Sequence, residues 1–140
     1  MCIRDRIIRY LEQNYSREVS LQEIAEAVGF NNNYICSVFK RDSGMTIGNC
    51  QTVIRIRKAA ELISFSDMSL TQVASATGFT NLSQFSRIFK KVTRIPPGQY
   101  RRMFASHIMC YGNPTHEATQ KILLQIGYII SFLGRKHMTI

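Results

Sequence analysis

Residues 78–100 read GFTNLSQFSRIFKKVTRIPPGQY, and this stretch decides the fold of the chain. Asn81 is suited to cap the start of a helix, with Gln84 three residues later. The helix that follows should have two faces, because residues three or four apart lie on one side. Its apolar face carries Phe85, Ile88 and Phe89, and its polar, basic face carries Ser83, Ser86, Arg87 and Lys90. Such a helix suits insertion into the major groove of a duplex, although a solvated surface helix has the same pattern.

The chain contains this pattern twice, which favours the nucleic-acid interpretation. A shift of 49 residues places Ser20, Leu21, Ala25, Ala27, Gly29 and Phe30 on Ser69, Leu70, Ala74, Ala76, Gly78 and Phe79. After one inserted residue, a shift of 50 places Asn31, Phe39, Lys40 and Gly48 on Asn81, Phe89, Lys90 and Gly98. A repeat of this kind indicates two copies of one structural unit, and each copy predicts a helix, a turn and a second helix.

The two units and the segment between them resemble the DNA-binding domain of the AraC/XylS family of bacterial transcription regulators. The resemblance runs from about Ile7 to Arg102. Its most specific part is GF…FSRIFKK…PPGQYR, echoed by SLQEIAEAVGF and RIRKAAELI. It implies an all-α fold in which a long connecting helix joins two helix-turn-helix subdomains, with about seven helices plus a C-terminal tail. The implied function is sequence-specific binding of double-stranded DNA by a transcription regulator, with two recognition helices in successive major grooves.

We divide the chain into five parts. Residues 1–5, MCIRD, resemble a translated sequencing adapter, and we expect a non-native scar, so that the native protein would extend upstream. The first helix-turn-helix unit covers residues 6–45, the connecting helix and joint cover 46–67, and the second unit covers 68–102. Residues 103–140 form a tail outside the resemblance. Its segment Ile122–Leu133 is apolar on nearly all sides, which indicates extra core or a functionless read-through tail, or alternatively a dimer contact.

Each unit is predicted to begin its helix-turn-helix with a capping box. Ser20 pairs with Glu23 in the first unit, and Ser69 pairs with Gln72 in the second. The hydroxyl should accept the backbone N–H three residues on, and the longer side chain should reach back to the cap. In front of the first box, Ile7, Leu11 and Tyr15 with Ile8 mark one face of a helix that ends near Asn14.

Glycines mark the expected helix ends, with one exception. Gly29 and Gly78 should end the first helix of each pair in a left-handed conformation, and Gly44 should stop the helix Asn31–Ser43. Arg94 stands where the first copy has Gly44. If the backbone there is left-handed, arginine costs about 1 kcal/mol relative to glycine.

The segment Ile47–Ile63 is predicted to be the connecting helix, because it has two apolar arcs. One arc carries Val53, Ile56, Ala59, Ala60 and Ile63, and the other carries Ile47, Cys50 and Ile54. A helix between two subdomains needs both arcs, whereas a surface helix needs one. Ser64–Asp67 is a short polar joint. Cys50 and Gln51 depart from the family pattern, which has an aromatic residue and leucine there, and Ile47 stands where the second copy has Pro97.

The resemblance assigns candidate DNA-binding residues by position. The base-reading candidates are Asn33, Cys36 and Ser37 in the first recognition helix and Ser83, Gln84, Ser86 and Arg87 in the second. The phosphate-binding candidates are Lys40, Arg41, Lys90 and Lys91. Phosphate contacts hold a protein on the duplex, whereas contacts to base edges carry the sequence preference.

The charge of the chain is strongly positive and unevenly distributed. The net charge of +9 and the pI of about 9.8 suit a polyanionic partner, either nucleic acid or an acidic membrane surface. Five basic residues balance five acidic ones from Val19 to Asp67, but no acidic residue occurs from Met68 to His116. We therefore expect the second unit to supply most of the salt-sensitive affinity. The longest apolar run has only twelve residues, too few for a membrane span.

Other classes of protein are less well supported by the sequence. The competing interpretation is a helical protein-interaction module that has lost DNA binding, because Cys36 and Ser37 are short where longer side chains would read bases better. An enzyme is not expected, since the chain has no Gly-rich phosphate loop, no HExxH and no GxSxG. His107 and Cys110 have ligand-like spacing, but two ligands do not make a zinc site, and no cofactor or metal is expected.

Partners and compartment follow from the same considerations. Double-stranded DNA is the expected partner, with no membrane. The resemblance implies RNA polymerase as a further partner, and a sensing domain upstream that this fragment lacks. Four cysteines without a CxxC pair or metal-like cluster, and no signal peptide, fit a reducing cytoplasm.

Overall fold

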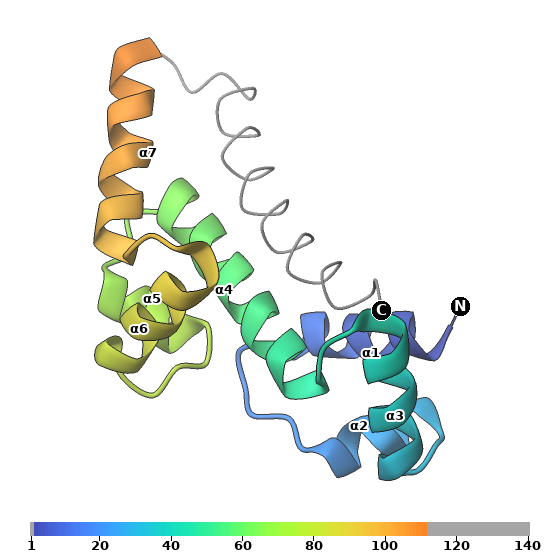
Figure 1. Cartoon of the computed structure of the whole chain (residues 1–140). Helices are drawn as coiled ribbons and strands as arrows, with labels where there is room; N and C mark the ends of the chain where they lie inside the picture. Colours follow the sequence, from blue (N-terminus) through green and yellow to red (C-terminus); the bar gives the residue numbers. More distant parts are fainter. Residues whose placement is uncertain (1, 112–140) are drawn as a thin grey trace.

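The computed structural model describes residues 2–111, with side chains up to residue 104. The described part contains helices and no strand, which confirms the all-α prediction (Figure 1). The helices are α1 (Ile3–Gln13), α2 (Leu21–Val28), α3 (Asn32–Ser43), α4 (Ile47–Phe65), α5 (Leu70–Ala76), α6 (Leu82–Thr93) and α7 (Pro97–Tyr111). Helices α2 and α3 form the first helix-turn-helix, and α5 and α6 form the second.

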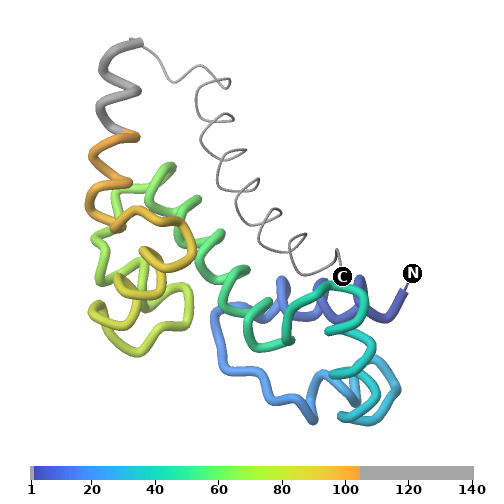
Figure 2. Tube along the Cα trace, in the orientation of Figure 1, coloured from blue at the N-terminus to red at the C-terminus, as the bar shows by residue number. Residues whose placement is uncertain are grey.

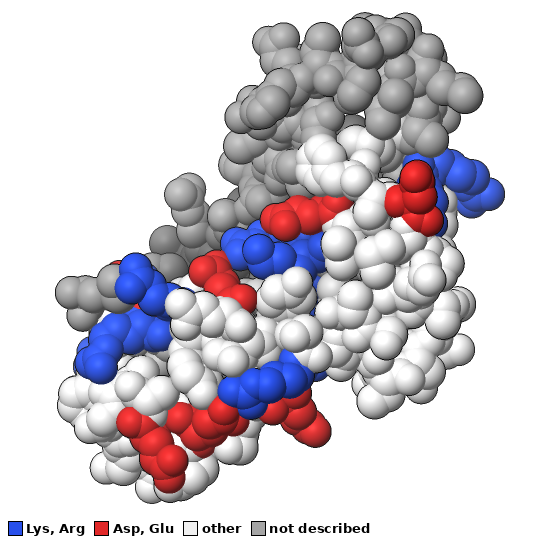
Figure 3. Space-filling view, turned by 180° about the vertical axis from the view of Figure 1, so that it is seen from behind, with Lys and Arg blue, Asp and Glu red and all other residues white. Residues whose placement is uncertain are grey.

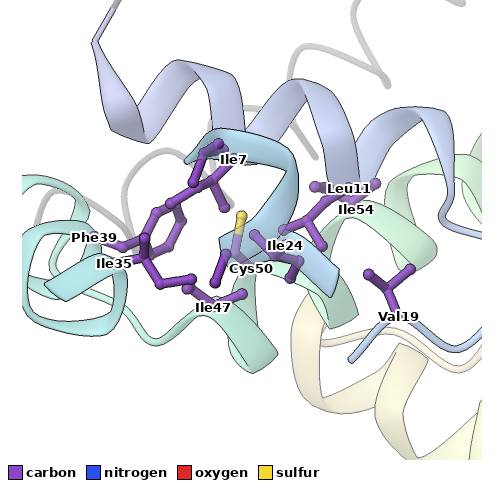
Figure 4. Packing of buried hydrophobic residues seen from close by; sticks show 11 residues of the cluster. Ile7, Leu11, Val19, Ile24, Ile35, Phe39, Ile47, Cys50 and Ile54 are labelled. Carbon is purple, nitrogen blue, oxygen red and sulfur yellow. The ribbon is translucent and has the colours of Figure 1, made fainter. Parts of the chain in front are cut away.

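The 19-residue helix α4 connects two groups of helices. Figure 2 shows the trace passing once from the group α1–α3, through α4, to the group α5–α7. Ile47, Cys50 and Ile54 of α4 belong to the first buried cluster, whose side chains point toward one another in Figure 4. Ile56, Ala59, Ala60 and Ile63 belong to the second cluster, with α5, α6 and Tyr100. The two predicted arcs of α4 are therefore present, and each one completes the core of a different unit.

Details of α4 differ from the sequence prediction. Val53 is only half-buried and belongs to neither cluster, although it was assigned to the second arc. The helix continues to Phe65, two residues beyond the predicted end, because the polar residues Ser64 and Ser66 turn their hydroxyls back to carbonyls of the helix. Cys50 is buried in the first core, and this burial raises the pKa of its thiol to about 11.

The two capping boxes turn out unequal. In the second unit the box is complete, since Ser69 accepts from the Gln72 N–H and the Gln72 side chain accepts from the Ser69 N–H. In the first unit Ser20 accepts from the Glu23 N–H at 3.1 Å, but the expected return bond is absent from the described contacts of Glu23.

The carboxylate of Glu23 is held by other partners. It forms an ion pair with Arg17 and accepts a hydrogen bond from the Tyr10 hydroxyl at 2.8 Å. The prediction of a full box was therefore wrong, because a charge-assisted bond to a guanidinium outcompetes a bond to a backbone amide. Arg17 and then Tyr10 lower the pKa of Glu23 from its ordinary value of 4.5 to about 2.

The turns after the first helix of each pair also differ in detail. Gly29 is the left-handed C-cap of α2, with φ of 83°. In the second unit α5 ends at Ala76, and Thr77 is the cap, because its buried hydroxyl donates to the Val73 carbonyl at 2.8 Å. Gly78 follows with φ of 89°, so it is left-handed but lies one residue beyond the cap.

Arg94 is the C-cap of α6 and has a left-handed backbone, with φ of 69° and ψ of 5°. Its counterpart Gly44 caps α3 with φ of 77° and ψ of 0°. Both N–H groups close the last turn, Arg94 onto the Lys90 carbonyl at 2.8 Å and Gly44 onto the Lys40 carbonyl at 2.9 Å. The condition for backbone strain at Arg94 is therefore met, and no other non-glycine residue among those described has a positive φ.

Helices α1 and α7 extend into residues that we assigned from the sequence to a non-native scar and to a tail. Residues Ile3–Asp5, which we assigned to a scar, lie in the first turn of α1. Helix α7 continues from Pro97 across the expected boundary at residue 102 to Tyr111. Ile122–Leu133 and the side chains of His107 and Cys110 lie outside the described residues. None of the described helices is both long enough and apolar enough to cross a membrane.

Candidate nucleic-acid interface

Helix α6 is fixed by a polar cap at its start and by aromatic side chains on its inner face. The Asn81 side chain accepts from the Gln84 N–H at 2.7 Å. Phe85 and Phe89 are fully buried. Ring centroids are 5.3 Å apart for Phe79 and Phe85, 5.6 Å for Phe85 and Phe89, and 5.7 Å for Phe89 and Tyr100. Each buried ring contributes about 2–3 kcal/mol from removal of apolar surface from water. This row of rings determines which face of α6 points outward.

The outward face of α6 carries most of the predicted binding residues. Ser83, Arg87, Lys90 and Lys91 are exposed. Gln84 and Ser86 are half-buried, so they offer less of their side chains to a partner than expected. The Gln84 carbonyl oxygen accepts from the Thr80 hydroxyl at 2.7 Å, which ties this side chain to the turn before the helix.

Helix α3 is built on the same plan. The Asn31 side chain accepts from the Tyr34 N–H at 2.8 Å, and Ile35, Val38 and Phe39 are buried. The predicted residues of this helix, Asn33, Cys36, Ser37, Lys40 and Arg41, are all exposed. The candidates thus form two sets, one on the exposed side of each recognition helix. The two recognition helices lie in the two helix groups that α4 joins (Figure 1).

The candidate residues of α3 and those of α6 differ in how far their positive charge is compensated by acidic neighbours. On α3, the Arg41 guanidinium pairs with the Asp42 carboxylate at 3.1 Å, so part of its charge is compensated. On α6, Arg87, Lys90 and Lys91 form no ion pair within the described residues, and the second unit has no acidic residue to offer them. Figure 3, seen from behind, shows both basic and acidic side chains over the first unit, with acidic ones at its lower end, whereas the second unit presents mostly uncharged surface on this side.

An aromatic pair beside the α3 candidates was not anticipated. Phe30 and Tyr34 are 41% and 45% exposed, and their ring centroids lie 5.1 Å apart. The matching Phe79 instead packs against Phe85 in the second core. The exposed pair adjoins Asn33, and its apolar surface suits contact with a thymine methyl group. The repeat alone does not reveal this difference, because Phe30 and Phe79 are the same residue type.

These observations define a protein with two helix-turn-helix units that share one connecting helix. A family model for the helix-turn-helix domain matches residues 24–103. The chain belongs to this helix-turn-helix family, in its AraC-type branch.

Similarity to individual proteins agrees with this assignment. A protein of Pseudoalteromonas carrageenovora, named as an uncharacterized HTH-type transcriptional regulator in the cgkA 5′ region, is 31% identical over 105 residues. The match covers 75% of this chain and 62% of that protein. The chain spans less than two thirds of the length of the curated relatives it matches first.

Solved structures share the fold. The C-terminal domain of AraT, a response regulator from Geobacillus stearothermophilus, has a TM-score of 0.68 and 29% identity, covering 74% of this chain and 86% of that one. A transcriptional regulator from Chromobacterium violaceum, described among AraC-type DNA-binding domain-containing proteins, has a TM-score of 0.71. At 23% identity, and covering 74% of this chain and 92% of that one, it supports the fold alone.

Proposed function

We propose that this chain binds double-stranded DNA with sequence preference, as the DNA-binding part of a transcription regulator. In this proposal α3 and α6 enter successive major grooves on one face of the duplex, about 34 Å apart. The observation that carries it is the pair of capped helices, each anchored by buried residues on one side and exposing polar and basic side chains on the other. The names of its relatives as HTH-type transcriptional regulators support the same assignment.

The two recognition helices, α3 and α6, would contribute unequally to DNA affinity and to base contacts. Arg87 is the one candidate base-reading side chain that offers a bidentate fork to guanine O6 and N7. Its counterpart Ser37 offers a single short hydroxyl. Lys90 and Lys91, which are exposed and have no acidic neighbour in their unit, suit phosphate oxygens. We therefore assign most of the affinity and one strong base contact to α6, with a weaker contribution from α3.

The wider setting of this domain is also proposed. RNA polymerase would be its partner at a promoter, in the cytoplasm, and a sensing domain would accompany it in the whole protein. The support is that the matching relatives are longer than the match and that two of them are named as HTH-type transcriptional regulators.

Selection of binding sites from a random duplex library tests the proposal. We expect enrichment of two short sequence elements whose centres lie about 10 base pairs apart, matching one helical turn. A matched selection with Phe89→Ala, which removes a buried anchor of α6, should lose the element read by the second unit. Recovery of no enriched sequence by the intact chain would contradict sequence-specific binding. Enrichment of a single element would contradict the use of two recognition helices.

A further inference from the structure

Arg55 lies at the point of α4 where the two cores meet. Ile54 belongs to the first buried cluster and Ile56 to the second. The half-buried guanidinium between them donates from Nε to the Tyr15 carbonyl at 2.9 Å and from Nη2 to the Arg17 carbonyl at 3.0 Å. Both carbonyls lie in the loop between α1 and α2. A single side chain of the connecting helix therefore holds the loop that leads into the first helix-turn-helix.

The turn of the second helix-turn-helix also lies against the Arg55 guanidinium. A Cβ atom at Gly78 would lie 3.1 Å from Cζ and from Nε of Arg55, and 3.1 Å from the Tyr15 carbonyl oxygen. Three segments thus converge on one guanidinium: the first unit's loop, α4 and the second unit's turn. The matching Gly29 is also left-handed, but a Cβ there would meet no atom within 4 Å. The close approach of the glycine backbone to Arg55 and the Tyr15 carbonyl therefore occurs only at Gly78 of the two matching glycines. The left-handed turn itself does not require it.

Neighbouring contacts support the same junction. The Lys58 ammonium, one turn beyond Arg55 on α4, lies 5.8 Å from the centroid of the Tyr15 ring. The Arg57 guanidinium pairs with the Glu12 carboxylate of α1 at 2.7 Å. Within residues 2–104, no hydrogen bond or ion pair links a side chain of α1–α3 directly to one of α5–α7. The relative orientation of the two units is therefore set through α4 and through this junction.

We propose that Arg55 is a positioning residue that fixes the angle between α3 and α6 and thereby the spacing between the two DNA elements that the chain accepts. The consequence for DNA recognition rests on the proposed function, whereas the geometry of the junction does not. The guanidinium is planar and its two donors have a fixed relation, so a tilt of one unit breaks at least one of the two bonds to carbonyls. Losing these bonds leaves α4, with its Arg57–Glu12 and Lys58–Tyr15 contacts, as the link and allows the units to rock.

The angle can be measured without DNA, by distances between spin labels on the two recognition helices. Cys36 of α3 is exposed, and Lys90→Cys provides the second label on α6. Cys2 and Cys110 are replaced by serine, while Cys50 is buried in the first core and so is shielded from the label. The full chain is used throughout, and each variant is checked for a cooperative melting transition.

Three substitutions are compared in this labelled background. Arg55→Ala removes both bonds, and Gly78→Ala forces its Cβ against the guanidinium and the Tyr15 carbonyl. Gly29→Ala is the matched control, because it carries the same left-handed strain in open space. We expect a single narrow distance distribution in the unsubstituted chain and in Gly29→Ala, and a broadened or shifted one in Arg55→Ala and Gly78→Ala. Identical label-distance distributions in folded Gly78→Ala and Gly29→Ala would overturn the proposal. The comparison of these two variants tests whether the junction fixes the angle between the units even if Arg55→Ala does not fold.

Binding to spaced sites gives the second readout. One inserted base pair rotates the second element by about a tenth of a turn, so the unsubstituted chain should lose about tenfold in affinity. Arg55→Ala should bind the original spacing more weakly but lose less than about threefold on insertion, because its units can reorient. An unchanged insertion penalty in the variant would overturn the positioning role. If the unsubstituted chain binds no duplex, the proposed function fails, whereas the label distances still decide whether Arg55 sets the angle.

Discussion

Replacing Arg94 by glycine should stabilise the fold, because Arg94 holds a left-handed backbone at the end of α6. A non-glycine residue in this conformation costs about 1–2 kcal/mol. Glycine loses more freedom on folding, which offsets about 0.4–1 kcal/mol of that gain. The N–H of residue 94 keeps its bond to the Lys90 carbonyl in either case. The net expectation is a gain of about 1 kcal/mol in the free energy of unfolding, or roughly 4 °C in Tm for a domain of this size.

Urea unfolding without DNA, followed by circular dichroism, measures this difference. Arg94→Ala serves as the control, because it removes the positive charge beside Lys90 and Lys91 but keeps the strained backbone. Gly44→Ala is the converse test at the matching cap of α3, where φ is 77°, and should cost about 1 kcal/mol. Equal stability of Arg94→Gly and Arg94→Ala would refute the reasoning, since the two differ chiefly in left-handed strain.

Two further predictions concern base reading and acid stability. Arg87→Ala should cost about 1–3 kcal/mol on the preferred site and relax the preference at one guanine. Lys91→Ala should weaken binding to all sequences alike, and Ser37→Ala should do little. Site selection with each variant measures this, and a retained sequence preference in Arg87→Ala, with only the overall affinity lowered, would show that Arg87 does not read a base. Because Arg17 lowers the folded-state pKa of Glu23 from 4.5 to about 2, its stabilising contribution is full above pH 4.5 and is lost as the pH falls toward 2. Between pH 5 and 2 the unsubstituted chain should therefore lose more stability than Glu23→Gln in urea unfolding, and parallel losses would show that the pair is not formed.

Much of the fold was predictable from the sequence, because the repeat and its local signals are consistent with one another. Asn31 and Asn81 cap the two recognition helices, and the apolar spacing of α4 assigns its two arcs to two cores. Local hydrogen-bonding residues and apolar periodicity act over a few residues, so they can be recognised without knowledge of the tertiary structure. The left-handed conformation at residue 94 could be anticipated because Gly44, and glycine in the family that the sequence resembles, stand at the matching place.

What could not be predicted depends on residues far apart in the chain. The Glu23 carboxylate binds Arg17 and Tyr10 instead of completing the capping box, and Tyr10 belongs to a different helix. The sequence did not indicate a role for Arg55, because the carbonyls that it binds belong to Arg17 and Tyr15, 38 and 40 residues earlier. Individual exposures within the interface, such as the half-buried Gln84, likewise depend on how the turn before the helix packs.

The salt dependence of duplex binding tests the central claim most directly. If the basic side chains of α6 and α3 neutralise roughly four to six phosphates, a plot of log K against log salt concentration should have a slope of about −4 to −5. Fluorescence anisotropy with a labelled duplex carrying the selected site, titrated at five salt concentrations, measures this slope. A slope near zero, or no binding at the lowest salt concentration, would contradict the assignment of DNA as the partner of these two helices.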